Sequence, residues 1–468
     1  MSVALHSAPL SNADLMEMDR AHALHPWTNF GPFEKDGALV ITRGQGCHLW
    51  DAQGRKYFDA VGGLWCTNIG LGRPEMARAI ADQAEKLAFS NYFVDMTNEP
   101  AARLAAKIAS LTPGDLNRVH FTTGGSTAVD TAVRMVGYYH HARGNPDKTD
   151  IVARENSYHG STYLSQSVGK RNGDRVAEFR YKTEGIHHLS CPNPYRRPDD
   201  MTEAQFCDHL IAEFESLIAR VGADHIGGFI AEPIQASGGI IIPPDGYLHR
   251  MWQVCQRHGI LFIADEVVTA WGRLGHWFAS FAEFGVQPDM ICTAKGLTSG
   301  YQPLGALIFS DAIWAVLAQG GERWFTSGLT YSGHPVACAA ALKNIEIIEN
   351  EDLLTHASTV GTYFESRMAL LSDLPLVGNV RGKKLMLCVE SVADKQTKEL
   401  LPDAANESKR ISNVAEQMGL LVRPIGHLNV MSPPLVITKS DVDFVAETLT
   451  VAIVRVTDDL VREGYKIG

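Results

Sequence analysis

Ile260-Leu-Phe-Ile-Ala-Asp265 and Met290-Ile-Cys-Thr-Ala-Lys295 are two short apolar runs that each end in a charged residue. Continuous apolar runs of this length predict strands that are buried on both faces, as in the parallel sheet of an α/β protein. Such sheets bind ligands at the carboxyl ends of their strands, so we expect Asp265 and Lys295 to meet in one crevice. From these two runs alone, a pair of surface charges or a salt bridge is the simpler interpretation.

A buried lysine beside a buried acid indicates a particular kind of ligand. Burial favours the neutral amine of Lys295, which is a nucleophile for aldehydes, whereas the Asp265 carboxylate requires a cationic partner. Pyridoxal phosphate offers an aldehyde to the lysine and a pyridinium nitrogen to the acid. This cofactor is therefore one hypothesis for the pair.

The centre of the chain alternates short apolar runs with amphipathic segments such as residues 206–221 and 248–258. This alternation predicts an α/β fold with a mostly parallel sheet between helices. The expected strands are residues 118–122, 150–153, 225–231, 260–264, 290–294 and 304–309.

The two ends of the chain have a different pattern, which favours a smaller α+β domain built from both. Strand patterns occur at residues 40–58 and 384–389, and long helical patterns occur at residues 335–350 and 440–462. We expect residues 71–330 to form the large domain. Residues 1–70 and 331–468 would then contribute to the small one.

Composition excludes several classes of protein. The 468 residues have 45% hydrophobic and 20% charged content and a formal net charge of −11, without a basic run. Binding to nucleic acid or to a membrane surface is therefore not expected. No signal-peptide pattern or long apolar segment is present, so we expect a cytoplasmic protein. The eight cysteines contain no C-x-x-C pair, which predicts neither a disulfide framework nor a metal site.

A possible phosphate site follows the strand expected at residues 118–122. There Thr123-Gly-Gly-Ser-Thr127 precedes a helical pattern that starts at Ala128. The backbone N–H groups at a helix amino terminus can hold a phosphate, and Gly125 and Ser126 are placed to do so. A plain helix cap is the alternative, because serine and threonine are preferred there in any case.

Several further motifs occur in a fixed order along the chain. They are Leu49-Trp-Asp-Ala-Gln-Gly-Arg55, Gly63-Leu-Trp-Cys66, Gly125-Ser126, Tyr158-His-Gly160, Ala231-Glu-Pro-Ile-Gln235, Ala264-Asp-Glu-Val267, Thr293-Ala-Lys-Gly296 and Thr330-Tyr-Ser-Gly-His-Pro335. With them the chain resembles the class III (ω-) aminotransferases, pyridoxal-phosphate enzymes of fold type I. The likeness is greatest to the amine and ω-amino acid:pyruvate transaminases and runs from about His25 to the carboxyl end.

The resemblance implies a seven-stranded, mostly parallel sheet and a catalytic role for Lys295 and Asp265. Lys295 would bond covalently to the cofactor and move a proton during the reaction. Asp265 would pair with the pyridine nitrogen, and Glu232 would support Asp265 or the surroundings of the ring hydroxyl. We assign His159 a structural role.

The resemblance also implies which residues bind the cofactor. Tyr158 and Val267 would cover the two faces of the ring, while Gly125 and Ser126 would hold the phosphate. Thr330 matches a threonine that reaches the phosphate of the neighbouring subunit. The expected assembly is therefore a homodimer with a shared active site, or a tetramer.

Substrate binding is expected to depend on Arg423, in Leu421-Val-Arg-Pro424. It matches the arginine that binds the keto-acid carboxylate in the pyruvate-using relatives, and a guanidinium suits that task. Ornithine- and γ-aminobutyrate-type relatives carry a glutamate that pairs with this arginine. Here Ser237 occupies that position, which argues against those two activities.

Trp65, Phe93 and Trp27 resemble the aromatic walls of the pockets that accept the amine, although ordinary hydrophobic packing would also explain them. The expected function is transfer of an amino group from a primary amine or ω-amino acid to pyruvate. Three alternatives stay open: a diaminopelargonate-synthase-like enzyme that uses S-adenosylmethionine, a decarboxylase or mutase on the same fold, and a non-enzymatic protein that binds the cofactor.

Overall fold

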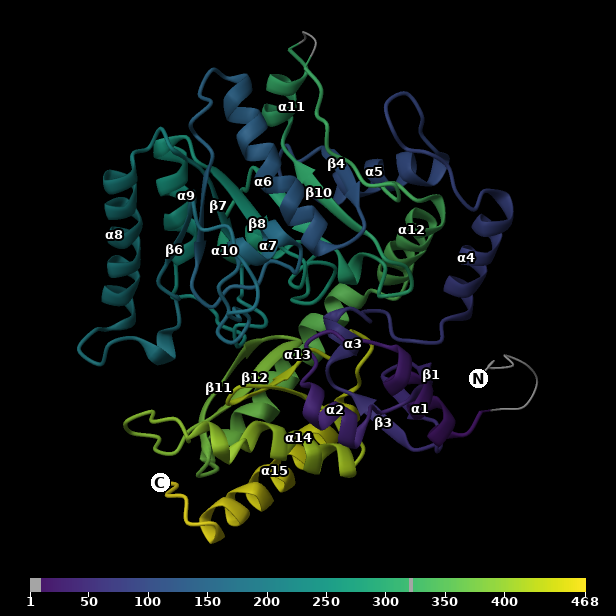
Figure 1. The fold of residues 1–468 in the computed structure, drawn as a ribbon, viewed down its shortest axis with the longest axis vertical. Coiled ribbons are helices and arrows are strands. Elements are labelled where there is room, and N and C mark those ends of the chain that lie inside the picture. Colours follow the sequence, from purple (N-terminus) through teal and green to yellow (C-terminus); the bar gives the residue numbers. More distant parts are fainter. Residues whose placement is uncertain (1–9, 320–322) are drawn as a thin grey trace.

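The computed structural model describes residues 10–319 and 323–468 (Figure 1). Its central element is a seven-stranded sheet. Strand β10 is antiparallel to both of its neighbours, and the remaining strands pair in parallel. The predicted α/β class with a mostly parallel sheet is thus confirmed. The strands follow the order β4 (Arg118–Thr122), β10 (Gly305–Phe309), β9 (Met290–Thr293), β8 (Leu261–Asp265), β7 (Ile226–Ala231), β5 (Asp150–Arg154) and β6 (Ile186–Leu189).

The six strands expected in the large sheet all occur, with ends that differ by one residue at most, whereas the strand expected at residues 384–389 is β12 (Met386–Ser391). Strand β6 was not expected, because its sequence Ile186-His-His-Leu189 has polar residues at its centre. This strand lies at the edge of the sheet and is only partly buried along most of its length. An edge strand therefore lacks the continuous apolar run that identifies its buried neighbours.

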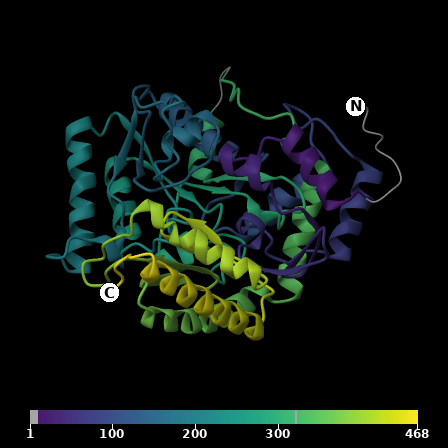
Figure 2. The ribbon, with the colours of Figure 1, turned by 60° about the horizontal axis from the view of Figure 1, so that its bottom comes forward.

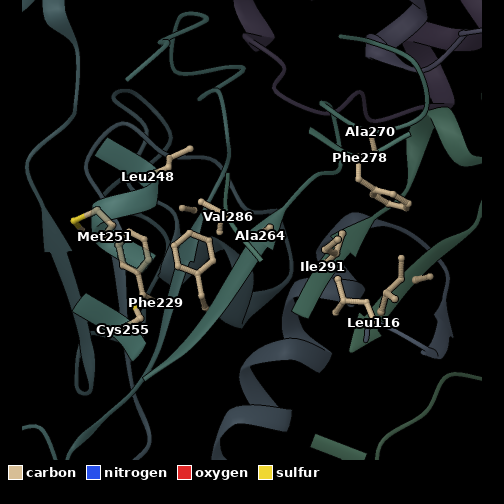
Figure 3. Close-up of a cluster of buried hydrophobic side chains, with 14 of the residues drawn as sticks. Leu116, Phe229, Leu248, Met251, Cys255, Ala264, Ala270, Phe278, Val286 and Ile291 are labelled. Carbon is tan, nitrogen blue, oxygen red and sulfur yellow. The ribbon is translucent and has the colours of Figure 1, made fainter. Parts of the chain in front are cut away.

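Helices cover both faces of this sheet, and alternate residues of each strand face opposite layers. Phe229 and Phe262 belong to the core beside α8 and α9, whereas Ile230 and Ile263 belong to the core beside α6. Figure 3 shows Phe229 among side chains of α9. The helices that follow individual strands of the large sheet along the chain are α6 (Gly125–Ala142), α7 (Tyr163–Val168), α8 (Glu203–Val221), α9 (Tyr247–His258), α10 (Ala279–Phe284) and α11 (Asp311–Leu317).

Two smaller sheets bring the ends of the chain together. Strand β13 pairs in parallel with β3, so a carboxyl-terminal strand completes an amino-terminal sheet. In Figure 1 the purple and yellow ends of the chain accordingly lie together below the large sheet. One sheet has the order β1 (Ile41–Gln45), β2 (His48–Asp51), β3 (Lys56–Asp59) and β13 (Leu420–Leu421), and the other has the order β11 (Val377–Lys383), β12 (Met386–Ser391), β15 (Leu428–Met431) and β14 (Arg423–Ile425).

The remaining helices pack around these sheets, and α14 and α15 lie side by side on the outer surface (Figure 2). Helix α12 packs against α4 and α5. Within the described residues, no helix is both long enough and apolar enough to cross a membrane. The helices are α1 (Asn12–His22), α2 (Phe30–Asp36), α3 (Gly62–Trp65), α4 (Pro74–Lys86), α5 (Glu99–Leu111), α12 (Pro335–Asn350), α13 (Leu353–Ala369), α14 (Glu407–Gln417) and α15 (Lys439–Arg462), with short 3-10 turns at Pro194–Arg196, Lys295–Leu297, Leu370–Asp373 and Asp403–Ala405.

A buried arginine ties the two chain ends to the segment that follows β8. Arg273 is fully buried and donates hydrogen bonds to the carbonyl oxygens of Leu385 and Pro433 and to Oδ1 of Asn68. Asn68 donates in turn to the carbonyl oxygen of Trp271. Desolvation lowers the pKa of Arg273 to about 10. These bonds fix the smaller sheets relative to the carboxyl ends of the large sheet, where the predicted site lies.

Replacement of Phe229 by alanine should lower the free energy of unfolding by about 3–5 kcal/mol, because it leaves a cavity in the core. The ring is fully buried and lies 5.3 Å from that of Phe214 and 5.4 Å from that of Phe262, between ring centroids. The measurement is urea denaturation of Phe229→Ala beside a matched control, Phe179→Ala, whose ring is exposed. Equal losses in the two variants would contradict the assignment of Phe229 to the core.

Candidate active site

A cavity of about 250 Å³ lies at the carboxyl ends of the large sheet and contains most of the predicted site. All of the predicted residues except Phe93 and Thr330 border it. The predicted catalytic and cofactor-binding residues among them are Gly125, Ser126, Tyr158, Glu232, Asp265, Val267 and Lys295, and the predicted substrate-binding residues are Trp27, Trp65 and Arg423.

Asp265 is the last residue of β8, and its carboxylate is held from two sides. Nδ1 of His159 lies 2.7 Å from its Oδ2, and the backbone N–H of Val267 donates to its Oδ1. The side chains of His159 and Asp265 are almost completely buried. Because a buried carboxylate is stable only when hydrogen-bonded or paired, the imidazole keeps this acid in place and aimed into the cavity.

His159 thus has a part in the site that the sequence analysis did not give it. The signal was its position in Tyr158-His-Gly160, directly beyond the end of β5. What could not be read from the sequence is the contact itself, since His159 and Asp265 are separated by 106 positions. The imidazole borders the cavity, but its hydrogen bond is to the Asp265 carboxylate. Its role is therefore to position that acid.

Lys295 follows β9 in a 3-10 turn, with a left-handed backbone (φ 44°). Its side chain borders the cavity and is half-buried. Desolvation lowers the pKa of its ammonium group below the ordinary value of 10.5, although the nearby Asp265 carboxylate acts in the opposite direction. A larger fraction of Lys295 is therefore present as the neutral, nucleophilic amine than for a lysine in water.

The first turn of α6 forms a cradle for an anion. The helix starts at Gly125, three residues earlier than the pattern predicted, and no side chain caps its first N–H groups. Ser126 Oγ accepts a hydrogen bond from the backbone N–H of Ser161. Gly160 packs so closely that a Cβ there would lie 2.5 Å from Ser126 Oγ. Free N–H groups at the start of an 18-residue helix suit a phosphate.

Glu232 anchors the two chain segments that flank the cavity. Its carboxylate accepts hydrogen bonds from the backbone N–H groups of Tyr158 and Ala236. Burial raises its pKa. It makes no hydrogen bond to Asp265, so within this structure it acts on the acid only through the field of its charge.

Arg423 is half-buried, and no carboxylate forms an ion pair with its guanidinium among residues 10–319 and 323–468. It starts β14, and its guanidinium carbon lies 5.9 Å from the ring centroid of Trp65. Desolvation, and then repulsion by Arg171, lowers its pKa. A guanidinium without a partner is suited to bind the carboxylate of a ligand.

Arg171 is a second arginine of the cavity, and it was absent from the sequence prediction. It is nearly buried, and its guanidinium lies 5.1 Å from the ring of Tyr158 and 5.8 Å from that of Trp27. Nε and Nη2 both donate to Asp174. Its charge is therefore compensated within the protein, unlike that of Arg423.

Phe93 and Thr330 lie away from this cavity. Phe93 is partly exposed and approaches Gly328, where a Cβ would lie 3.2 Å from its ring. Thr330 is exposed in the turn before α12. Phe93 therefore does not line the cavity of its own chain, and the role that the resemblance implies for Thr330 concerns the neighbouring subunit.

The residues of the cavity fit pyridoxal phosphate. An uncapped helix start accepts a phosphate, a fixed carboxylate suits the pyridine nitrogen, and a lysine of lowered pKa suits the aldehyde. Tyr158 and Val267 both border the space between these groups. The side chains needed to hold the cofactor therefore meet in one place.

Comparison with known proteins gives the class. The family described as aminotransferase class-III matches residues 32–453, and the chain belongs to this family of pyridoxal-phosphate enzymes. It is 39% identical to the putrescine–pyruvate aminotransferase of Pseudomonas aeruginosa, over 95% of this chain and 97% of that one.

Solved structures with a similar fold belong to the same class of enzyme. An (S)-enantioselective omega-transaminase from Thermomicrobium roseum has a TM-score of 0.93 and 39% identity, over 96% of this chain and 100% of that one. The omega transaminase from Pseudomonas jessenii in complex with PMP has a TM-score of 0.92 and 35% identity, over 95% of this chain and 98% of that one. The predicted family, fold type and cofactor are thus confirmed.

Replacement of Gly160 by alanine should weaken cofactor binding at least about tenfold, because the new Cβ would displace Ser126 and the start of α6. The measurement is titration of the apoprotein with pyridoxal phosphate. Gly246→Ala is the control, since Gly246 also has a positive φ (76°) but open space around it. Equal affinity in both variants would show that the packing at Gly160 does not shape the cradle.

Proposed function

We propose that this enzyme transfers an amino group from a primary amine or an ω-amino acid to pyruvate by a ping-pong mechanism. The unpaired guanidinium of Arg423 carries the proposal, because it offers a site for the keto-acid carboxylate in the cavity that contains Lys295 and Asp265. The similarity to a putrescine–pyruvate aminotransferase supports this pair of substrates.

Each residue has a separate task in this proposal. Pyridoxal phosphate, when bound, supplies an aldehyde and a ring that accepts electrons. Asp265, aimed by His159, holds a proton at the pyridine nitrogen. Lys295 moves a proton at the substrate carbon with its amine, whose neutral form is favoured by desolvation. Arg423 binds and orients the keto acid, and it must leave room when an amine without a carboxylate enters.

The purified holoenzyme should have a visible absorbance band that bleaches when an amine donor is added and returns with pyruvate. Lys295→Ala should lack this band and should lose at least about a thousandfold in turnover, because no other amine can replace the nucleophile and proton carrier. Lys383→Ala is the control, since Lys383 forms an ion pair with Glu283 outside the cavity. A normal spectrum in Lys295→Ala would refute the assignment of Lys295.

The absorbance assay and an analysis of the products together separate the alternative reactions. Bleaching by S-adenosylmethionine but not by simple amines would indicate a diaminopelargonate-synthase-like donor, and a return with 2-oxoglutarate but not pyruvate would change the acceptor. Release of carbon dioxide or of a rearranged isomer would indicate a decarboxylase or a mutase. Any of these outcomes would replace the proposed substrates without changing the family.

We further propose that the enzyme is a homodimer with a shared active site. Thr330 is exposed and lies outside its own cavity, which agrees with a role at the phosphate of a neighbouring subunit. Exposed apolar side chains lie near it, and a subunit contact would bury them. Tyr331 follows Thr330 directly, the ring of Phe89 lies 6.2 Å from that of Tyr331 between ring centroids, and Phe93 approaches Gly328.

Mixed dimers test the sharing of the site. In a dimer of one Lys295→Ala chain and one Thr330→Ala chain, a shared arrangement puts both defects in one site and leaves the other site intact. We therefore expect about half of the wild-type activity, with wild-type cofactor affinity, only after the two variants are coexpressed. If Thr330 serves its own chain, no intact site forms and coexpression restores no affinity.

We also propose a cytoplasmic location, because all eight cysteines are free thiols, as is usual in a reducing compartment. Fractionation of cells that produce the protein is the test, and recovery outside the cytosolic fraction would overturn this assignment.

A further inference from the structure

Besides Nε2 of His159, two buried polar groups of residues that border the cavity have no hydrogen-bond partner among the described residues. They are the indole N–H of Trp65 and the hydroxyl of Ser237. Trp65 is 4% exposed and Ser237 is 6% exposed, and both border the cavity. A buried donor without a partner is costly, so each such group calls for an explanation.

Trp65 lies beside Arg423, and Ser237 belongs to the lining of the same cavity. Trp65 packs in one hydrophobic cluster with Ala236, the neighbour of Ser237, and with Val430. Val430 is the strand partner of Arg423 in the β14–β15 pair. The indole of Trp65 also faces the guanidinium of Arg423. Three donors from distant parts of the chain thus border one cavity.

Ser237 is held rigidly in this position. The chain on either side of it pairs through reciprocal backbone hydrogen bonds between Gln235 and Ile241, and the N–H of Ile240 donates to the carbonyl oxygen of Ala236. The Gln235 side chain donates to the carbonyl oxygen of Glu155. The hydroxyl can therefore rotate, but its serine cannot move far to find a partner within the protein.

We propose that Ser237 determines specificity by donating its hydroxyl proton to the substrate carboxylate that Arg423 binds, with the Trp65 indole N–H as a further donor. The proposal rests on the function proposed above and names the group that the cavity recognises. An ionised carboxylate has about four acceptor positions, of which a guanidinium occupies two, so neutral donors can use the others. An apolar substituent at the same place would leave both donors unpaired, and the site would disfavour it.

Binding of propionate, an unreactive carboxylate, to the holoenzyme tests the proposal. We expect Ser237→Ala to raise its dissociation constant about tenfold and Trp65→Phe, which keeps an aromatic ring, to raise it several fold. The rate at which n-butylamine bleaches the holoenzyme should not fall in Ser237→Ala, because this amine has no carboxylate and the variant removes a donor that the amine leaves unpaired.

Two matched controls come from the same class of side chain. Ser391 in β12 has a buried hydroxyl without a partner, and Trp252 in α9 has a buried indole N–H without one, both outside the cavity. Ser391→Ala and Trp252→Phe should leave propionate binding unchanged, and thermal melting of all four variants should show that they fold.

Unchanged propionate affinity in Ser237→Ala, or an equal loss for propionate and n-butylamine, would overturn the proposal. A loss of similar size in the control variants would do the same. If propionate binding depends on Ser237 but pyruvate restores no absorbance, the carboxylate site stands and only the proposed acceptor is wrong.

Discussion

Burial of a lysine and an acid at the ends of neighbouring parallel strands is the constraint on which the site depends. In the β8–β9 pair, Asp265 lies opposite Cys292, so the chain reaches Lys295 just beyond the edge of the sheet. Neither charge is tolerable there without compensation. His159 and the Val267 N–H stabilise the acid, and the lysine responds through a lowered pKa. A cavity with these two groups is therefore poised for a ligand that has an aldehyde and a basic ring nitrogen.

The sequence predicts those parts of the fold that depend on burial. Strands β7, β8 and β9 are covered on both faces, so their apolar runs identify them, and the acid and the lysine at their ends can be read directly. Edge strand β6 has no such run. The contact of His159 with Asp265 and the position of Arg171 are set by tertiary packing between distant segments, and no local pattern encodes them. Motif resemblance placed most of the cavity residues, whereas the position of Thr330 outside its own cavity becomes visible only in three dimensions.

The two arginines of the cavity illustrate why residue type alone does not identify a substrate site. Arg171 and Arg423 both border the cavity, and each lies near an aromatic ring. The difference is in their partners. Asp174 compensates Arg171 with two hydrogen bonds, so Arg171 contributes mainly shape and a planar surface between Tyr158 and Trp27. Arg423 has no such partner among the described residues, so its charge is available to a ligand. Repulsion between Arg423 and Arg171 is relieved when an anion binds between them and the solvent.

The cofactor side and the substrate side of the cavity come from different sheets. Lys295, Asp265 and the start of α6 belong to the large sheet and its first connections, whereas Arg423 belongs to the sheet of the chain ends. The buried bonds of Arg273, in the segment after β8, to Asn68, Leu385 and Pro433 hold the two parts together. Substitutions around Arg423 can therefore alter the substrate side of the cavity without moving the lysine or the acid.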